Sequence, residues 1–395
     1  MHLFLSVGEP SGDLHASKLI EELRRRIPGL RCSGFGGPLM QAAGCEIHYR
    51  LTDLAVMGIL AVIPLLWRFV SLLHSAGRFL DRERPDAVLL VDFPGFNWWI
   101  ARLAKRRGIP VYYYLPPQLW AWAPWRIRKM RRLVDQVLCC LPFEDAWYRN
   151  RNVPVQYVGH PFFDEVALRR LDQNFLDEQR QKTAPEGLIV GILPGSRNIE
   201  IDMNFNLQLQ VMANLHRRFP NVRFLVASYR AAQRRKCEEI LAASKLDLPI
   251  EFHVGRTSEV IELAHVCLMV SGSVSLELLA RSTPAVVIYR SGPFHYWLGR
   301  LLITCRFISL PNLMADHRLL PEFVVLGDSR PDIQTITGIL ETWLSDPAAH
   351  AAVVADLRRL RNEVAVPGAT ARAATAILER LTAEVPAPDA SRAAA

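Results

Sequence analysis

Several signatures of common enzyme classes are missing from this sequence of 395 residues. It has no Walker A sequence and no complete G-x-G-x-x-G turn, which argues against a P-loop NTPase and against ordinary dinucleotide binding. It also lacks a G-x-S-x-G nucleophile elbow, so a hydrolase with a Ser-His-Asp triad is not expected. No acidic D-x-D pair ends an apolar strand, so nothing predicts a Mg²⁺ or Mn²⁺ site.

Cysteine is scarce and poorly spaced for disulfide or metal chemistry. There are seven Cys, an odd number, and no C-x-x-C pair. Cys139 and Cys140 are adjacent in an apolar run, which is poor geometry for a disulfide. We therefore expect reduced thiols, as in cytosolic proteins. Met1 leads directly into the apolar run Leu3–Val7, without the basic region of a secretory signal.

No apolar run is long enough to cross a bilayer easily. The longest is Ile59–Leu73, which Pro64 interrupts, and as a helix it would rise about 22 Å against a hydrocarbon core of roughly 30 Å. It is interpreted either as a buried core helix or as a surface that touches a bilayer or accepts acyl chains. Phe294–Phe307, with Arg300 and Arg306, is a second candidate of this kind.

The formal net charge is +8, and most of the basic residues are Arg. An Arg surplus suits phosphate, because the planar guanidinium holds two oxygens at once. It would also attract an anionic membrane surface or nucleic acid, and a solvated basic surface explains it equally well. Charge alone does not identify a partner.

Short apolar runs alternate with helical stretches in two consecutive series. This pattern predicts βαβ units with mainly parallel sheets. The strands expected in the first series are Leu3–Val7, Arg31–Phe35, Ala87–Val91, Val111–Leu115, Gln136–Leu141 and Gln156–Val158. Those expected in the second are Leu188–Leu193, Arg223–Ala227, Ile250–Val254, Val266–Val270 and Ala285–Tyr289. The fold class is α/β, with two Rossmann-like doubly wound domains facing across a cleft and ligands at the carboxyl ends of strands.

The polar stretch Leu168–Glu186 separates the two series. We expect an N-terminal domain over residues 1–170 and a C-terminal domain over residues 171–345. Helices over residues 346–383 are expected to pack back on an N-terminal domain, and the tail 384–395, rich in Ala and Pro, is expected to be disordered.

Small residues gather where expected strands end and helices begin. The first such turn is Gly8-Glu9-Pro10-Ser11-Gly12-Asp13, although Ser11 or Asp13 could simply cap a helix starting at Leu14. In the second series, Gly195 lets main-chain N–H groups approach an anion. Ser196 adds a hydroxyl and Arg197 a charged fork, with Glu200 just before a helix.

A second turn of this kind is Ser271-Gly272-Ser273, which opens a helix whose N–H groups favour a bound phosphate. Glu277, one turn into that helix, is placed to accept hydrogen bonds from ribose hydroxyls, or is a solvated helix residue. Two such turns in one half fit a nucleotide diphosphate held without a metal.

Asp92 ends the apolar run Ala87–Val91, which reads as a fully buried parallel strand, and Asn97 follows the next turn. A carboxylate there could take a proton from a sugar hydroxyl if burial raises its pKa, or it could cap the next helix. His160 lies between the two halves and fits a hinge donor better than a catalyst.

Aromatic residues cluster shortly after this strand. They form either a platform for sugar or lipid, or part of the core. They are Tyr112, Tyr113, Tyr114, Trp120, Trp122 and Trp125.

From Leu3 to Leu381 the sequence resembles the lipid-A-disaccharide synthase family. In the first half the similar motifs are Gly8-Glu9-Pro10-Ser11-Gly12-Asp13, Gly36-Gly37-Pro38-Leu39-Met40, Leu54-Ala55-Val56-Met57-Gly58, Asp92-Phe93-Pro94-Gly95-Phe96-Asn97, Trp120-Ala121-Trp122, Leu141-Pro142-Phe143-Glu144 and Val158-Gly159-His160-Pro161. In the second half they are Leu193-Pro194-Gly195-Ser196-Arg197, Ser271-Gly272-Ser273 with Glu277, and Ser309-Leu310-Pro311-Asn312-Leu313.

The resemblance implies a glycosyltransferase-B fold and transfer with inversion from UDP-2,3-diacylglucosamine to 2,3-diacylglucosamine 1-phosphate, forming a β(1→6) bond and releasing UDP. It implies no cofactor and no metal, a peripheral place on the cytoplasmic face of the inner membrane, and a homodimer whose C-terminal helices cross between subunits. No nucleic-acid partner is expected.

The resemblance also implies roles for individual residues. Asp92 matches the family's general base, and Arg197 and Asn312 match positions that the family needs for activity. The residues expected to bind the substrates are Glu9, Ser11, Gly12, Asp13, Asn97, His160, Gly195, Ser196, Arg197, Glu200, Ser271, Gly272, Ser273, Glu277, Asn312 and Glu322.

The sequence departs from the family pattern at three places. Gly95 replaces a second acid, Pro116-Pro117-Gln118 replaces a Ser-Pro-Ser, and Val325 replaces an amide that would contact the donor sugar. Two alternatives stay open: another two-domain UDP-sugar enzyme, such as a glycosyltransferase with a different lipid acceptor or a UDP-N-acetylglucosamine 2-epimerase, and a non-catalytic relative that binds nucleotide or lipid.

Overall fold

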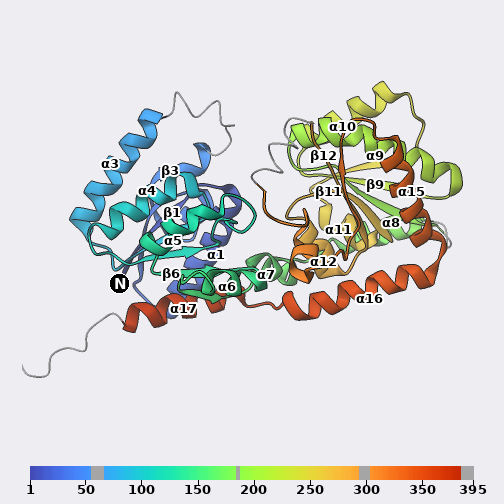
Figure 1. Cartoon of the computed structure of the whole chain (residues 1–395). Coiled ribbons are helices and arrows are strands. Elements are labelled where there is room, and N and C mark those ends of the chain that lie inside the picture. The colour runs from blue at the N-terminus through green and yellow to red at the C-terminus, as the bar shows by residue number, and fades with distance from the viewer. Residues whose placement is uncertain (55–65, 184–186, 293–302, 384–395) are drawn as a thin grey trace, which may run out of the picture. The chain divides into compact units, whose positions relative to one another are not determined.

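The computed structural model describes residues 1–54, 66–183, 187–292 and 303–383, and the chain divides into two compact units (Figure 1). The first unit comprises Met1–Asp164 and the chain from Pro367 onward, and the second is Glu165–Val366. The chain thus passes between the units after Asp164, whereas the sequence predicted a boundary at residue 170.

The first unit is built on one parallel sheet with the strand order β3-β2-β1-β4-β5-β6-β7. Its strands are β1 (His2–Val7), β2 (Arg31–Gly36), β3 (Glu46–Arg50), β4 (Ala87–Val91), β5 (Val111–Tyr114), β6 (Gln136–Cys139) and β7 (Val155–Tyr157). Its helices are α1 (Pro10–Arg26), α2 (Pro38–Ala42), α3 (Leu66–Glu83), α4 (Pro94–Lys105), α5 (Ile127–Leu133), α6 (Pro142–Arg149) and α17 (Ala369–Ala383), with 3₁₀ turns η1 (Leu51–Leu54) and η4 (Pro124–Arg126). Helix α7 (Pro161–Leu168) spans the division.

An apolar core lies on each face of this sheet. Side chains of α3, α4 and α5 pack over one face with Phe4 and Val88. Side chains of α1 and α17 pack over the other face with Leu3 and Leu89. Because successive strand residues point to opposite faces, a strand covered on both sides must be apolar throughout. This is why β4 is an uninterrupted apolar run and why β1 is apolar from Leu3 to Val7 except at Ser6, whose buried hydroxyl donates to Asn97.

The two C-terminal helices belong to different units. Helix α16 (Pro347–Val364) packs against α12, α14 and α15 of the second unit, so the expectation that residues 346–383 pack together on the N-terminal domain does not hold for it. Helix α17 packs against α1 of the first unit, where Ala373, Ala374 and Ile377 are buried.

The Asp164 carboxylate holds the start of α17. It accepts hydrogen bonds from the main-chain N–H groups of Gly368, Ala369 and Thr370, at 2.6, 3.1 and 2.9 Å. These donors have no partner within the helix, because the first turn has no preceding carbonyl groups. A side chain from the first part of the chain thus closes the unit around its C-terminal helix.

We expect Asp164→Ala to lower the free energy of unfolding of the first unit by about 1–2 kcal/mol, the usual effect of removing a helix-capping acceptor. Asp164→Asn, which keeps one acceptor oxygen, should lose less. Urea denaturation followed by circular dichroism measures both. Equal stability of the Ala variant and the unmodified chain would contradict this role.

The second unit has a parallel sheet with the strand order β10-β9-β8-β11-β12-β13. Its strands are β8 (Ile189–Leu193), β9 (Arg223–Ser228), β10 (Ile250–Val254), β11 (Val266–Val270), β12 (Ala285–Arg290) and β13 (Glu322–Val325). Its helices are α8 (Gln173–Lys182), α9 (Asn198–Arg218), α10 (Ala231–Ser244), α11 (Thr257–Leu263), α12 (Ser275–Arg281), α14 (Leu310–Ala315), α15 (Arg330–Ser345) and α16.

Two strands were missed by the sequence analysis, β3 and β13, and both lie at an edge of their sheet. Strand β3 (EIHYR) alternates polar and apolar residues and so lacks the apolar run that marks a central strand, and β13 (EFVV) has only four residues. The structure also explains Val325, the departure expected at a donor-sugar contact. This side chain is fully buried in the core of the second unit beside Ile288 and Ile336.

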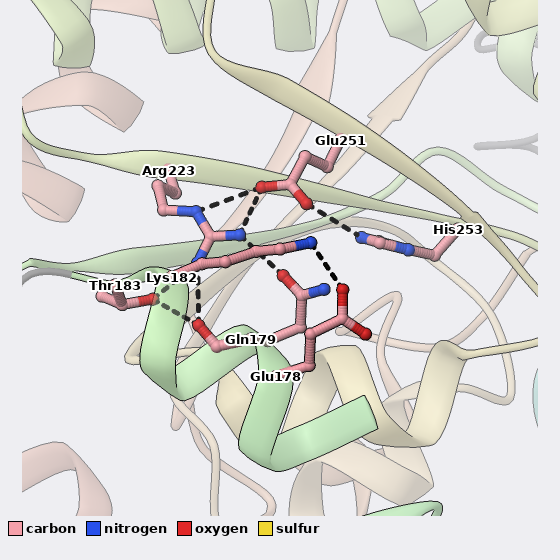
Figure 2. A network of polar contacts seen from close by, with 7 residues as sticks. All are labelled: Glu178, Gln179, Lys182, Thr183, Arg223, Glu251 and His253. Carbon is pink, nitrogen blue, oxygen red and sulfur yellow. Dashed lines mark hydrogen bonds and ion pairs between the residues drawn. The ribbon is translucent and has the colours of Figure 1, made fainter. Parts of the chain in front are cut away.

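A polar network fixes α8 to one edge of the second sheet (Figure 2). The Arg223 guanidinium donates to Gln179 Oε1 and Thr183 Oγ1, both at 2.6 Å, and forms an ion pair with Glu251. Arg223 begins β9 and Glu251 lies on β10, so one side chain joins two strands to the helix that opens this unit. The network serves architecture, because it lies at the amino-terminal ends of these strands and not at the carboxyl ends, where ligands bind in such sheets.

Several expectations fall outside the described residues. They are the segment Ile59–Leu65, the loop Ala184–Glu186, most of Phe294–Phe307 and the tail 384–395. Within the described ranges, no helix combines the length and the apolar character that crossing a bilayer requires.

Candidate active site

In the first unit, β1 and β4 are the neighbouring strands from which the chain winds to opposite sides of the sheet. Ligands in open α/β sheets bind at such a point, outside the carboxyl ends of the strands. The last residues of the two strands, Val7 and Val91, are paired. The turns that follow them touch: a Cβ added to Gly8 would lie 2.2 Å from the Phe93 ring. Only glycine allows the two turns to approach this closely.

Asp92 lies directly at this crossover between β1 and β4, in an unusual backbone conformation. Its φ is +47° and that of Phe93 is +46°, and left-handed geometry of this kind costs about 1–2 kcal/mol for each L-residue. Two buried donors hold the turn, since Asn97 Nδ2 and the Tyr113 hydroxyl each donate to the Asp92 main-chain oxygen at 2.7 Å. Strain that is held in this way is typical of functional positions.

Asn97, expected to bind substrate, supports the Asp92 turn instead. Its side chain is fully buried, accepts from Ser6 Oγ at 2.6 Å, and donates to the main-chain oxygens of Ser6 and Val91 at 3.2 Å. An amide occupied on both ends by protein is a positioning group. Tyr113, on β5, has the same role and was not identified from the sequence as part of the site.

Burial raises the pKa of the Asp92 carboxyl, and a hydrogen bond from the Phe93 main chain and the nearby His15 imidazole oppose this rise. The carboxylate does not cap α4, because the residue at the cap position is Phe93 and no side-chain cap bond forms there. A carboxylate with a raised pKa that remains within reach of solvent is suited to general-base catalysis.

His15 is a site residue that the sequence analysis missed. It lies on α1, is buried, and its ring meets the His160 ring edge to face, with centroids 6.1 Å apart. Burial, and then His15, lower the pKa of His160 to about 3, so His160 is neutral. His160 Nδ1 accepts the Phe162 N–H at 3.2 Å. His160 therefore packs beside His15 and cannot act as a general acid near neutral pH.

We expect His15→Gln to move the acidic limb of the kcat/KM against pH profile to higher pH. His15 lowers the pKa of Asp92, so its removal raises that pKa, and the base is then lost at a higher pH as the solution is acidified. His74→Gln, exposed on α3, is the control. A uniform loss of rate with an unmoved limb would mean that His15 acts only in packing.

The remaining residues expected in the first turn have different environments. Asp13 is 2% exposed and accepts the N–H groups of Gly37, Leu39 and Met40, at 3.0 to 3.1 Å, so it caps α2. It is not available to a ligand, and α1 begins at Pro10 and not at the expected Leu14.

Three residues of the same turn complete its description. Gly12 is buried against Val7 and Val91, where a Cβ would lie 3.0 Å from Val7 Cγ1. Glu9 is half-buried, and Ser11 is exposed. Only Glu9 and Ser11 therefore remain as candidate ligand contacts in this turn.

In the second unit, β8 and β11 form the equivalent crossover point. Gly195 follows β8 with a φ of +109°, and a Cβ there would lie 2.7 Å from Glu200. The Glu200 carboxylate accepts the N–H groups of Ser196 and Arg197 at 2.8 and 3.1 Å. The Glu200 carboxylate thus occupies the two main-chain N–H groups that were expected to bind a phosphate. A diphosphate would have to compete with Glu200 for these N–H groups.

The Arg197 side chain is 77% exposed at the start of α9, and within the described ranges its ion pair is to Glu200, at 3.5 Å. A guanidinium so weakly engaged can turn its fork to phosphate oxygens. It is therefore the strongest candidate anion ligand in this turn.

The turn after β11 lies beside this one, because β8 and β11 pair. Gly272 and Ser273 are exposed, and Ser271 Oγ donates to the Ile308 main-chain oxygen at 2.8 Å. Among the described residues, nothing lies within 4 Å of a Cβ added to Gly272, so their packing does not require a glycine here.

Glu277 is buried at 2% exposure, so it is not a solvated helix residue. Arg281 donates to it at 3.2 Å, and Arg169 lies 3.9 Å from its second oxygen. Ribose hydroxyls would have to displace Arg169 to reach this carboxylate. Its role as a ribose acceptor stays a prediction.

Asn312 and Glu322 hold the segment next to Ser271. Asn312 is fully buried, accepts the N–H groups of Leu319 and Leu320 at 2.8 and 2.7 Å, and donates to the Leu320 oxygen at 2.8 Å. Glu322 accepts the N–H groups of Ile308 and Ser309 at 2.9 and 2.8 Å. Both hold the main chain in this structure; Asn312 is closed off from solvent, whereas Glu322 is partly exposed.

Among the described residues, no three or more His, Cys, Asp or Glu side chains are grouped to hold a metal ion. The aromatic cluster divides into two sets. Tyr112, Tyr113, Tyr114 and Trp120 are buried in the cores, and Trp122 and Trp125 are exposed.

Known proteins of similar fold share this arrangement of two parallel sheets. The UDP-GlcNAc 2-epimerase from Neisseria meningitidis, solved bound to UDP-GlcNAc, aligns with a TM-score of 0.65 at 14% identity over 97% of this chain and 100% of that chain. The calicheamicin glycosyltransferase CalG4 aligns with a TM-score of 0.62 at 16% identity over 98% of this chain and 99% of that chain. They establish the glycosyltransferase-B fold.

Sequence relatives are more specific. The lipid-A-disaccharide synthase of Azoarcus sp. (strain BH72) is 36% identical over 376 residues, 95% of each chain. That of Anaeromyxobacter dehalogenans (strain 2CP-1) is 34% identical over 378 residues, 95% of this chain and 96% of the relative. The family model described as lipid-A-disaccharide synthetase matches residues 3–355. The chain therefore belongs to the lipid-A-disaccharide synthase family.

Proposed function

We propose that this chain transfers 2,3-diacylglucosamine from UDP-2,3-diacylglucosamine to the 6-hydroxyl of 2,3-diacylglucosamine 1-phosphate. The products are the β(1→6) disaccharide 1-phosphate and UDP. The observation that carries the proposal is Asp92, a carboxylate with a raised pKa held by Asn97 and Tyr113 at the crossover point of the first sheet. An acid built into a strained turn in this way fits the base that an inverting transfer needs.

In the proposed reaction, Asp92 takes the proton from the acceptor hydroxyl as its oxygen attacks the anomeric carbon of the donor. The bond between that carbon and the UDP oxygen breaks on the opposite face, which inverts the centre. Arg197 stabilises the charge that grows on the leaving diphosphate. Because a guanidinium supplies this charge, no metal or other cofactor is proposed, and EDTA should leave the rate unchanged.

The test is to incubate the purified chain with both proposed substrates and to measure UDP release together with the disaccharide 1-phosphate by mass spectrometry. Formation of both products in equal amounts supports the proposal. Donor consumption only with a different lipid acceptor would assign a related transferase, and epimerised UDP-sugar without an acceptor would assign an epimerase. Nucleotide binding without turnover would assign a non-catalytic relative.

The proposed location is the cytoplasmic face of the inner membrane, where the chain would be a peripheral protein. The proposed oligomeric state is a homodimer. These proposals rest on the family resemblance and on the lipid character of the substrates. The described end of the first candidate membrane segment supports contact with lipid, since Trp67 is 82% exposed and Val70 is also exposed on α3.

A further inference from the structure

Exposed tryptophans of this chain gather in one layer of the first unit. Among the described residues, four Trp side chains are at least half or nearly half exposed: Trp67 82%, Trp99 52%, Trp122 49% and Trp125 61%. They lie on α3, on α4 and in the loop between β5 and α5, and α4 packs against both α3 and α5 (Figure 1). These helices cover the same face of the sheet.

This layer of tryptophans also lies near the carboxyl edge of the sheet. Trp67 is the second residue of α3, and Trp99 lies in the second turn of α4, which begins two residues after Asp92. Trp122 and Trp125 follow the carboxyl end of β5, the strand that pairs with β4. The exposed indoles are therefore near the carboxyl ends of the strands, the edge of the sheet at which the candidate base Asp92 also lies.

Buried hydrogen bonds hold the loop that carries Trp122 and Trp125. The Glu144 carboxylate, 2% exposed, accepts the Trp120 Nε1–H at 2.8 Å and the N–H groups of Cys140 and Leu141 at 3.1 and 3.0 Å. Its pKa is raised by burial. The Tyr148 hydroxyl donates to the Pro117 oxygen at 3.3 Å. The loop is thus ordered with two large apolar side chains in water, an arrangement that marks an interaction surface.

Cations accompany these indoles. The Arg126 guanidinium lies 4.3 Å from the centre of the Trp122 ring, and that of Arg102 lies 5.2 Å from Trp99. Between Asp92 and Asp135 the sequence has nine Arg or Lys residues and no acidic residue. Four of these cations are exposed around α5 and form no ion pair with any residue in the described part of the chain. They are Arg128, Lys129, Arg131 and Arg132.

We propose that Trp99, Trp122, Trp125 and the four cations of α5 form a surface, here called the tryptophan-arginine surface, that binds a bilayer containing anionic phospholipid. This inference rests on the proposed function, because an acceptor that resides in a membrane must reach Asp92 from the bilayer. Indoles prefer the interface between headgroups and acyl chains, where one edge is wet and the ring is apolar. Exposed Arg and Lys gain about 1 kcal/mol each near an anionic lipid surface.

A bilayer is chosen over nucleic acid because exposed indoles and exposed cations occur together on this surface. Duplex nucleic acid would also attract the cations, but its bases are stacked inside the helix and give exposed indoles little to bind. Single-stranded nucleic acid can stack on aromatic rings, but the proposed function supplies a lipid acceptor and no single strand. Helix α4, which carries Trp99, packs against α3, whose exposed Trp67 already supports lipid contact.

The experiment measures partitioning of the purified full chain onto sedimented vesicles of phosphatidylcholine, with and without phosphatidylglycerol. Arg131→Gln with Arg132→Gln should weaken binding to the anionic vesicles about thirtyfold, and raising the salt concentration should erase most of the difference. Arg217→Gln with Arg218→Gln, two cations of α9 in the second unit, is the matched control and should change nothing. Trp125→Ser should weaken binding to both vesicle types by about tenfold or more.

A second measurement locates the indoles directly. Binding to vesicles with bromine-labelled acyl chains should quench part of the tryptophan fluorescence. Trp122→Phe with Trp125→Phe should lower that quenching, and adding Trp99→Phe should lower it further. All substituted side chains are exposed, so circular dichroism should show unchanged folding.

Two results would overturn the inference. The first is equal partitioning of the α5 variant and its control onto anionic vesicles. The second is that the unmodified chain binds a short DNA duplex more tightly than anionic vesicles, and that the α5 variant loses this DNA binding. The proposed function is judged separately by UDP release with a short-chain, water-soluble acceptor. Vesicle binding without transfer would reject the proposed function alone, and transfer without vesicle binding would reject the tryptophan-arginine surface alone.

Discussion

Asp92→Asn should lower the turnover number by about 10²–10⁴-fold, the usual contribution of a general base, and should leave the affinity for UDP nearly unchanged. The amide has the size of the carboxyl group but cannot take a proton from the acceptor hydroxyl. The affinity for UDP should persist because the candidate nucleotide turns belong to the second unit.

Asn is the informative replacement because of the backbone at this position. The φ of Asp92 is +47°, and Asn enters the left-handed region more readily than other residues with a side chain. The variant should therefore keep the turn that Asn97 and Tyr113 hold, and any loss of rate reports chemistry and not misfolding. Asp145→Asn, on the surface of α6, serves as the control carboxylate.

Turnover is measured as UDP release at saturating donor and acceptor, and UDP affinity by isothermal titration. Turnover within threefold of the unmodified chain would remove Asp92 from the mechanism. A parallel loss of UDP affinity would indicate that the substitution disturbs more than the base.

Arg197→Ala should lower kcat/KM by about 10²–10³-fold, the range measured when one charge-stabilising donor is removed from a transition state. In this turn the Ser196 and Arg197 amides already bind the Glu200 carboxylate, so the guanidinium carries more of the interaction with the diphosphate. Its 77% exposure shows that it supports no core packing, and the variant should fold normally.

Arg197→Lys separates charge from geometry. Lysine keeps the positive charge but loses the planar fork that binds two oxygens, so it should recover only part of the activity. Arg218→Ala lies at the far end of the same helix, α9, and is the matched control. If Arg197→Ala and Arg218→Ala gave equal kcat/KM values, Arg197 could not bind the diphosphate.

The sequence predicted the central strands well, because a strand covered on both faces must be apolar throughout. It did not predict the edge strands β3 and β13, since β3 alternates polar and apolar residues without an apolar run and β13 is only four residues long. The positions of Asp92 and Gly195 at strand ends were likewise readable, because the end of an apolar run and a glycine are local features.

The hydrogen-bond partners of the polar side chains could not be predicted from the sequence. Asp13 was expected to meet a ligand or to cap its own helix, yet it caps α2, whose first residues are more than twenty positions away. Asn97, Asn312 and Glu322 were expected to bind substrate, yet their hydrogen bonds are made within the protein. His15 gave no signal in the sequence, because its importance depends on the approach of α1 to the Asp92 turn.

The sequence by itself determined the family, the two α/β units, the acid that follows β4 and the arginine in the turn after β8. The tertiary structure decided the burial and the hydrogen-bond partners of the sixteen expected binding residues, and it alone brought the exposed tryptophans and the α5 cations into one layer. The physical reason is that burial and hydrogen bonding are satisfied between segments distant in the chain. A residue type shows what a side chain can bind, and only the fold shows what it already binds.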